Sequence, residues 1–159
     1  MNDVRAAEIE AALRALVARV EPEAEVMFEH HDVRPIGYSW DGRRLRVTGA
    51  TYESRVHEIA HLLVAPASRR REPEFGLGPD PYRRGFVART VSLEEADREE
   101  LDACDLQLVI VRVLGLDEAL TQSEYGTPPL TPERVRALRD RHPEALPPAW
   151  WERALERGG

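Results

Sequence analysis

The segment His57-Glu58-Ile59-Ala60-His61 contains the residue types that bind and use a catalytic metal ion. On an α-helix, positions i and i+4 lie about 40° apart around the axis and one turn along it, so both imidazoles can reach one ion at about 2.0 to 2.1 Å. Glu58 projects to the side of that pair, where it can take a proton from a metal-bound water instead of binding the metal. The pattern predicts His57 and His61 as metal ligands and Glu58 as the general base.

The residues around this motif predict a helix with definite ends. Thr51 can cap it, Glu53 falls in its first turn, and Pro66 stops it. Its other positions are largely apolar, so the helix is expected to be buried, and two imidazoles without partners would then cost several kcal/mol. A metal ion would supply the partner. The alternative is a polar cluster that is satisfied by hydrogen bonds or exposed at the surface.

A third ligand is needed, because catalytic zinc usually has three protein ligands and one water. The segment 93–114 is predicted to be a helix with an acidic first half and an apolar second half, opened by Ser92. Within it, Glu100 is our first choice, since Ala103 one turn later would let a neighbouring helix approach closely.

Other carboxylates and histidines compete with Glu100. Glu99 lies near the middle of the apolar sector of the same helix, and Asp102 ranks third. Each could instead be a solvated carboxylate favoured by the helix dipole. His30 and His31, in a predicted strand, are the alternative source of a ligand if the two helices do not pack together.

The remaining pattern predicts an α+β fold over a single domain, residues 1–159. An amphipathic helix is expected over 3–20, and short helices should open at Thr131-Pro132 and Pro147-Pro148. Extended segments on either side of Asp41-Gly42, which suits a tight hairpin, predict a small antiparallel sheet of two or three strands packed on the helical core. Residues 66–91 are rich in Pro, Gly and Arg and are predicted to form a long loop.

Composition narrows the class of function. The net charge is −7, and all 22 basic residues are arginine, which excludes lysine chemistry and argues against nucleic acid or membrane lipid as a partner. A single cysteine, Cys104, offers no disulfide framework and is expected to be a small buried residue of a cytoplasmic protein. The oligomeric state is left open.

Arginines bracket the long loop after the motif. Arg69-Arg70-Arg71 and Arg83-Arg84 could bind an acidic substrate or stabilise an oxyanion, and Tyr82 could donate a hydrogen bond to a carbonyl oxygen. The plainer interpretation is a solvated face whose arginines pair with nearby acids.

Two resemblances follow from these motifs. The HExxH sequence followed by a helical Glu-x-x-Ala, Glu100 to Ala103, resembles the gluzincin type of zincin metallopeptidase. The stretch "HEIAHLLVAPASRRREPEFGLGPDP" is similar to the motif region of the elongation factor P hydroxylase family, with Leu62 where that family has tryptophan. The second resemblance implies that His57, His61 and a carboxylate form a facial triad for iron-dependent oxygen chemistry.

The leading hypothesis is a zincin-like metal-dependent hydrolase that acts on a peptide or protein substrate. Zinc is the expected metal, with iron as the alternative. The first rival is an iron-dependent hydroxylase. The second is a non-catalytic protein-binding domain that contains a metal site.

Overall fold

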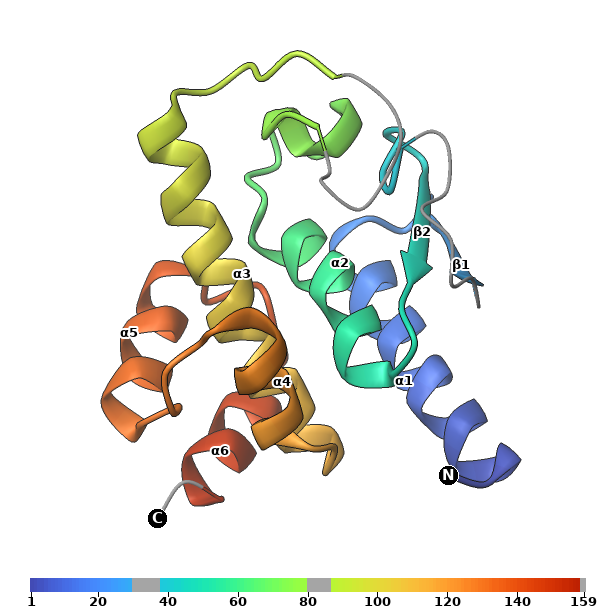
Figure 1. Cartoon of the computed structure of the whole chain (residues 1–159), viewed down its shortest axis with the longest axis vertical. Helices are drawn as coiled ribbons and strands as arrows, with labels where there is room; N and C mark the ends of the chain where they lie inside the picture. Colours follow the sequence, from blue (N-terminus) through green and yellow to red (C-terminus); the bar gives the residue numbers. More distant parts are fainter. Residues whose placement is uncertain (30–37, 80–86, 158–159) are drawn as a thin grey trace.

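The computed structural model describes residues 1–29, 38–79 and 87–157, and these residues have an α+β architecture, as predicted (Figure 1). In chain order the elements are α1 (Asp3–Val20), β1 (Glu25–Glu29), β2 (Arg44–Thr48), α2 (Tyr52–Val64), the 3-10 helix η1 (Pro73–Gly76), α3 (Leu93–Leu114), α4 (Glu118–Tyr125), α5 (Pro132–Arg141) and α6 (Pro148–Glu156).

Helix α2 carries the HExxH motif and begins and ends where the sequence predicts. The Thr51 side chain accepts a hydrogen bond from the Ser54 backbone N–H, and the Ser54 hydroxyl reaches back to the Thr51 backbone N–H. This reciprocal cap satisfies donors that the first turn leaves unpaired. The helix contacts α1, β2, α3 and α4, so most of its side chains are buried.

The predicted antiparallel sheet is wrong, because β1 pairs with β2 in parallel, from Glu25 opposite Arg44 to Glu29 opposite Thr48. The Asp41-Gly42 turn does form: Asp41 Oδ1 accepts from the backbone N–H groups of Arg43 and Arg44. It produces only an isolated antiparallel bridge between Trp40 and Leu45. The local signal therefore identified the turn correctly, but the main partner of β2 is the earlier strand β1, and a local signal does not indicate that parallel pairing.

Helix α3 spans the predicted residues, with Ser92 as its N-cap and Gly115 in the left-handed conformation (φ 68°) at its end. Helix α4, which follows directly, was not predicted. It has eight residues, and Thr121 is the buried one, so its sequence lacks the apolar stripe on which helix prediction depends.

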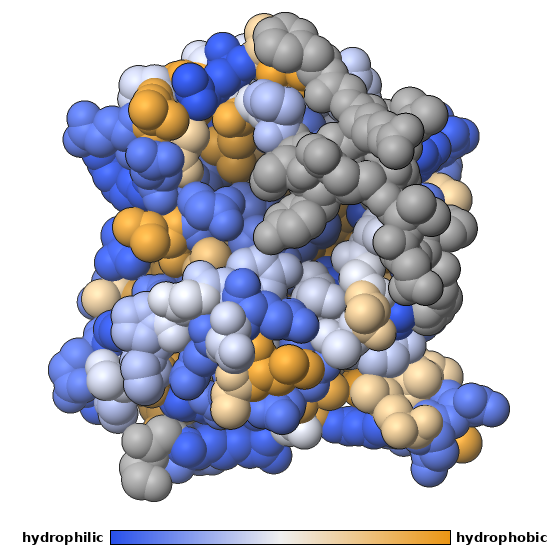
Figure 2. Space-filling model, in the orientation of Figure 1, coloured by the Kyte–Doolittle hydropathy of each residue, from blue (hydrophilic) through white to orange (hydrophobic). Residues whose placement is uncertain are grey.

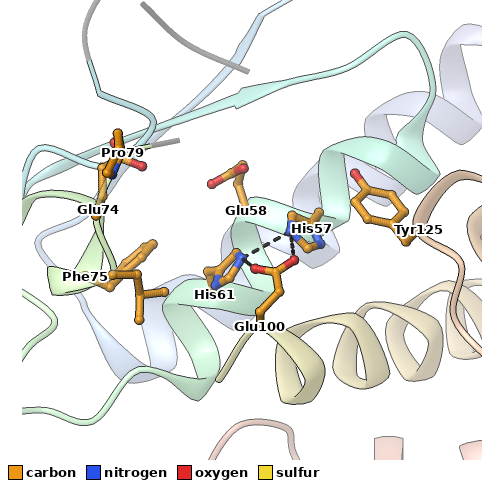
Figure 3. A pocket seen from close by; sticks show the side chains of 10 residues that line it. His57, Glu58, His61, Glu74, Phe75, Pro79, Glu100 and Tyr125 are labelled. Carbon is orange, nitrogen blue, oxygen red and sulfur yellow. Dashed lines mark hydrogen bonds and ion pairs between the residues drawn. The ribbon is translucent and has the colours of Figure 1, made fainter. Parts of the chain in front are cut away.

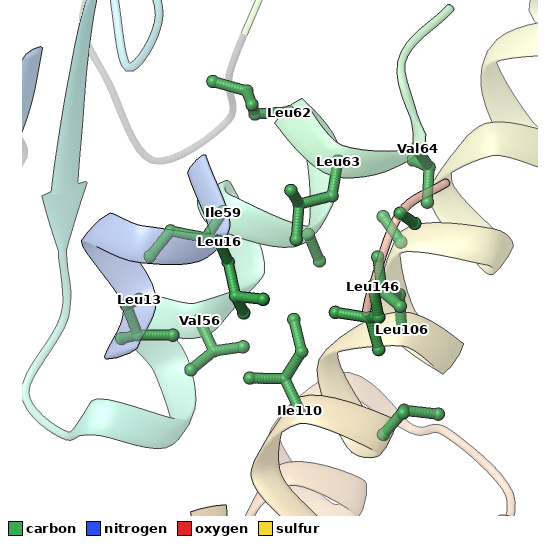
Figure 4. Close-up of a cluster of buried hydrophobic side chains, with 14 of the residues drawn as sticks. Leu13, Leu16, Val56, Ile59, Leu62, Leu63, Val64, Leu106, Ile110 and Leu146 are labelled. Carbon is green, nitrogen blue, oxygen red and sulfur yellow. The ribbon is translucent and has the colours of Figure 1, made fainter. Parts of the chain in front are cut away.

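The hydrophobic core lies where α1, α2 and α3 meet, as Figure 4 shows for Leu16, Ile59 and Ile110. Residues of β2, α5 and α6 belong to the same buried cluster. On the face drawn in Figure 2, hydrophilic residues predominate and apolar ones occur in small separate groups. Within the described residues, no helix is both long enough and apolar enough to cross a membrane.

Candidate metal centre

The structure brings His57, His61 and Glu100 together in one group (Figure 3). The Nε2 atoms of the two histidines are 3.1 Å apart, and the Glu100 oxygens lie 3.3 Å from His57 Nε2 and 2.9 Å from His61 Nε2. Ligand atoms around a tetrahedral ion at about 2.0 to 2.2 Å are themselves separated by roughly 3.3 to 3.6 Å. The three side chains therefore fit one transition metal ion after a small outward adjustment.

Two packed helices position these ligands. His57 and His61 are one turn apart on α2, and α3, which packs beside it, contributes Glu100. Ala103, one turn after Glu100, is completely buried. The predicted packing of the two helices is therefore correct, and the predicted ligand set converges.

The competing carboxylates on α3 have other partners. Glu99 forms a buried ion pair with Arg69, which links α3 to the segment after α2. Asp102 accepts hydrogen bonds at 2.6 Å from Arg141 and from His142 at the end of α5. Burial opposes ionisation of Asp102, but these hydrogen bonds outweigh it and lower its pKa. Both residues are engaged by these other partners, and the group of ligand atoms contains Glu100 instead.

The alternative ligands His30 and His31 remain predictions. His30 and His31 lie outside the described residues. His142 is occupied by Asp102.

Gln107, which the sequence analysis did not single out, orients His57. Its Oε1 atom lies 3.0 Å from His57 Nδ1, and its Nε2 atom donates to the Glu53 carbonyl oxygen at 2.8 Å. Because the amide nitrogen is committed to that carbonyl, Oε1 must be the acceptor, so His57 carries its proton on Nδ1. Nε2 is then the nitrogen that can bind a metal, and it lies on the side of Glu100 and His61. A polar residue inside the apolar run "LQLVIV" was the available signal.

The electrostatics of the group favour a cation at its centre. Burial lowers the pKa of His61, but the hydrogen bond and charge of Glu100, with smaller contributions from Glu58 and Glu99, outweigh it and raise the pKa to about 9. Burial likewise opposes ionisation of Glu100, yet both histidines hold its pKa well below the ordinary range. Without a metal, a proton on His61 balances the negative charge of Glu100, and a divalent ion would balance it more fully.

Cys104 lies beside the ligands but is not equipped to be one. Its Sγ atom is 3.6 Å from Glu100 Oε1 and donates to it. Burial, followed by the charge of Glu100, raises the pKa of the thiol to about 12. The thiol therefore stays protonated, and metal ligation by cysteine needs the thiolate.

A pocket of about 220 Å³ opens beside the three ligands. Glu58 lines it, and in Figure 3 its carboxylate lies apart from the cluster of His57, His61 and Glu100. The Tyr125 ring stacks on His57 with centroids 4.5 Å apart. The other residues that line the pocket are Glu74, Phe75, Leu77, Gly78 and Pro79.

The described arginines after the motif pair with acids and with backbone carbonyl oxygens, as the interpretation of an ordinary arginine-rich face predicts. Arg69 pairs with Glu99, Arg70 donates to the carbonyl oxygens of Ala65 and Val20, and Arg71 pairs with acids near the end of α1. Tyr82 and Arg83-Arg84 lie outside the described residues, so their predicted roles remain predictions.

Comparison of the chain with protein-family models, with curated proteins and with solved structures found no match. The functional conclusions below therefore depend on the geometry of the site.

Proposed function

We propose that this protein is a metal-dependent hydrolase of the zincin metallopeptidase type, with zinc held by His57, His61 and Glu100. The convergence of these three side chains from two helices, beside a pocket that Glu58 also lines, carries the proposal. A zinc ion bound there would act as a Lewis acid that polarises a carbonyl group and makes water more acidic.

The residues of the chain would divide the remaining work. Glu58 would accept the proton of the attacking water and pass it to the departing amine nitrogen, since its carboxylate lies at the pocket without a place among the ligands. Gln107 would keep His57 in the tautomer that exposes the Nε2 lone pair. Glu100 would balance part of the positive charge of the ion.

The open side of the site supports catalysis over a structural role. Structural zinc is usually enclosed by four protein ligands, whereas a catalytic site leaves a position for water or substrate. The group contains three ligands within the described part of the chain, and a pocket adjoins it. This argues against a non-catalytic protein-binding domain.

An iron-dependent hydroxylase is the second candidate, because two histidines and one carboxylate are also the ligands of non-haem iron oxygenases. The donor set favours this reading as much as it favours zinc. The two proposals differ in the metal retained and in whether oxygen is consumed.

The proposed substrate is a peptide or protein. The net charge of −7 disfavours nucleic acid and anionic lipid as partners, because binding to phosphate needs clustered positive charge. We place the activity in the cytoplasm, where the Cys104 thiol would stay reduced.

Hydrolysis of peptides tests the proposal. Metal-stripped protein would be reloaded with zinc or with ferrous iron and incubated with a mixed peptide library, and the products analysed by mass spectrometry. New peptide termini with zinc support a hydrolase. A mass gain of one oxygen atom, found only with iron and air, would support the hydroxylase instead.

A further inference from the structure

The two histidines of the proposed metal site are held in different ways. The Nδ1 atom of His57 has a hydrogen-bond partner in Gln107. The Nδ1 atom of His61 is buried and has no such partner among the described residues. Histidine ligands usually donate this N–H to an acceptor, which fixes the orientation of the ring. Among the described residues, therefore, no hydrogen bond at Nδ1 fixes the ring of His61, and another contact can take that role.

An aromatic ring occupies that role. The Phe75 ring lies nearly parallel to the His61 ring, with centroids 6.2 Å apart and planes 15° apart. Phe75 also stacks on Trp40, with ring centroids 5.6 Å apart and planes 8° apart. Phe75 and Trp40 are almost completely buried, so the stack is fixed in the interior and not a surface contact.

The backbone around Phe75 adopts a conformation that side chains rarely favour. Glu74 and Phe75 have φ values of 50° and 56°, and Gly76 continues the left-handed turn at 73°. For residues with a Cβ atom this conformation is energetically unfavourable and persists only where the surroundings enforce it. Such residues occur disproportionately at functional sites, and this pair lines the pocket beside the proposed ligands.

Polar contacts of Glu74 hold the turn in this conformation, and they distinguish the role of Glu74 from that of Phe75. The carboxylate of Glu74 accepts from the Ser39 hydroxyl at 2.5 Å and from the Trp40 backbone N–H at 3.1 Å, while the Glu74 N–H donates to the Trp40 carbonyl oxygen at 2.9 Å. Glu74 is thus an anchor that joins the turn to the segment before β2. That anchoring leaves Phe75 directed toward His61.

Arg69 connects the same turn to α3, the helix that carries Glu100. Its guanidinium donates to the Phe75 carbonyl oxygen at 2.5 Å and pairs with Glu99, the residue before Glu100. The turn that contacts one proposed ligand is therefore fixed relative to the helix that carries another.

We infer that Phe75 is a positioning residue for the metal site, held by the left-handed turn Glu74-Phe75-Gly76 so that its ring orients His61 in place of a hydrogen bond. The inference rests on the proposed function, because it assigns Phe75 a role in metal binding. It predicts that removing the aromatic ring weakens metal binding through His61 alone.

Zinc affinity, measured by competition with a chromophoric chelator, tests this inference in a double-mutant cycle. Phe75→Leu and Phe75→Met both keep apolar volume and lose the ring, so one of them serves if the other does not fold. Each is made in the wild-type chain and in Gln107→Leu, which weakens the site through His57 and still binds zinc measurably. Leu77→Ala, which changes the same pocket two residues further on, is the control.

We expect the Phe75 variants to lose about tenfold in zinc affinity in the wild-type chain, within the range for residues that support a ligand, and to lose the same factor again in Gln107→Leu, because the two residues support different histidines. Leu77→Ala should bind zinc like the wild type. An unchanged affinity in the folded Phe75 variants, or no further loss in Gln107→Leu, overturns the inference. A wild-type protein that binds no zinc overturns the proposed function instead.

Discussion

Gln107 accepts a hydrogen bond from His57 across the interface between α3 and α2, with 3.0 Å between Oε1 and Nδ1. Its amide nitrogen is engaged by the Glu53 carbonyl oxygen, so the direction of the hydrogen bond to His57 is fixed. A single side chain on the helix of Glu100 therefore determines which histidine nitrogen is free to bind a metal.

Replacing Gln107 by Leu should reduce zinc affinity 10- to 100-fold, because His57 loses the acceptor that selects its tautomer. Chelator competition at neutral pH measures the effect. Gln107→Glu is the matched variant: it keeps an acceptor oxygen for His57 and should retain zinc affinity, although it loses the donor to Glu53. Wild-type affinity in Gln107→Leu would show that the hydrogen bond is irrelevant to the site.

Glu58→Gln should keep its metal and lose turnover by a factor of about 10² to 10⁴, the usual contribution of a general base. The amide preserves size and hydrogen bonding but cannot take the proton of water. Elemental analysis and peptide cleavage on the same sample check both halves of the prediction. Loss of the metal in this variant would instead make Glu58 a ligand.

Glu99→Ala and Glu100→Ala should have opposite effects although the residues are neighbours. Removing Glu99 takes the nearer of two carboxylates from the buried Arg69, leaving Glu95 at 4.0 Å, and should cost about 3 kcal/mol of unfolding free energy, while the metal stays bound. Removing Glu100, whose side chain is 49% exposed, should release the metal and, in the metal-free chain, remove the pH-dependent stability that His61 gains from this carboxylate. Denaturant unfolding and metal titration separate the two effects. Equal metal loss in both variants would contradict this assignment.

The parts of the fold that local signals specify were predictable from the sequence. The caps Thr51 and Ser92 and the Gly115 stop set the ends of α2 and α3, and those ends match the structure. Glu100 was preferred because Ala103 follows one turn later, and it is the carboxylate that reaches the histidines. The pairing of His57 with His61 follows from helix periodicity, which a single sequence displays directly, whereas the same periodicity favoured Glu99 and the small residue Ala103 decided for Glu100.

The missed features depend on contacts between distant segments or on unusual backbone. The parallel pairing of β1 with β2 is nonlocal, and α4 has too few buried residues to show a helical period. The stack of Phe75 on His61 requires positive φ at residues that are not glycine, for which sequence offers no signal. Gln107 was visible only as a polar residue in an apolar run.

The metal-free protein should lose stability as the pH rises from about 6.5 to about 9. The folded-state pKa of His61 is raised from 6.5 to about 9, since the hydrogen bond and charge of Glu100 outweigh the opposing effect of burial. A pKa that is raised in the folded state contributes stability. This contribution is complete at a pH below the pKa of the unfolded state and disappears as the pH rises through the pKa of the folded state. Urea unfolding across this range measures the slope.

Two comparisons isolate His61 in that experiment. In His61→Gln the alkaline loss should be smaller, because the titrating group is gone. In zinc-loaded protein it should also be smaller, because a metal-bound imidazole is already neutral. An identical slope in all three samples would assign the effect to other groups.

The most direct test of the central claim is the metal content of the purified chain, measured by elemental analysis after incubation with zinc and with ferrous iron and removal of unbound metal. We predict about one equivalent of transition metal per chain in the wild type and in Glu99→Ala, and almost none in His57→Ala, His61→Ala or Glu100→Ala, since each of these removes one of three protein ligands. A wild-type protein without metal under both conditions, or variants of the three residues that retain it, would contradict the account.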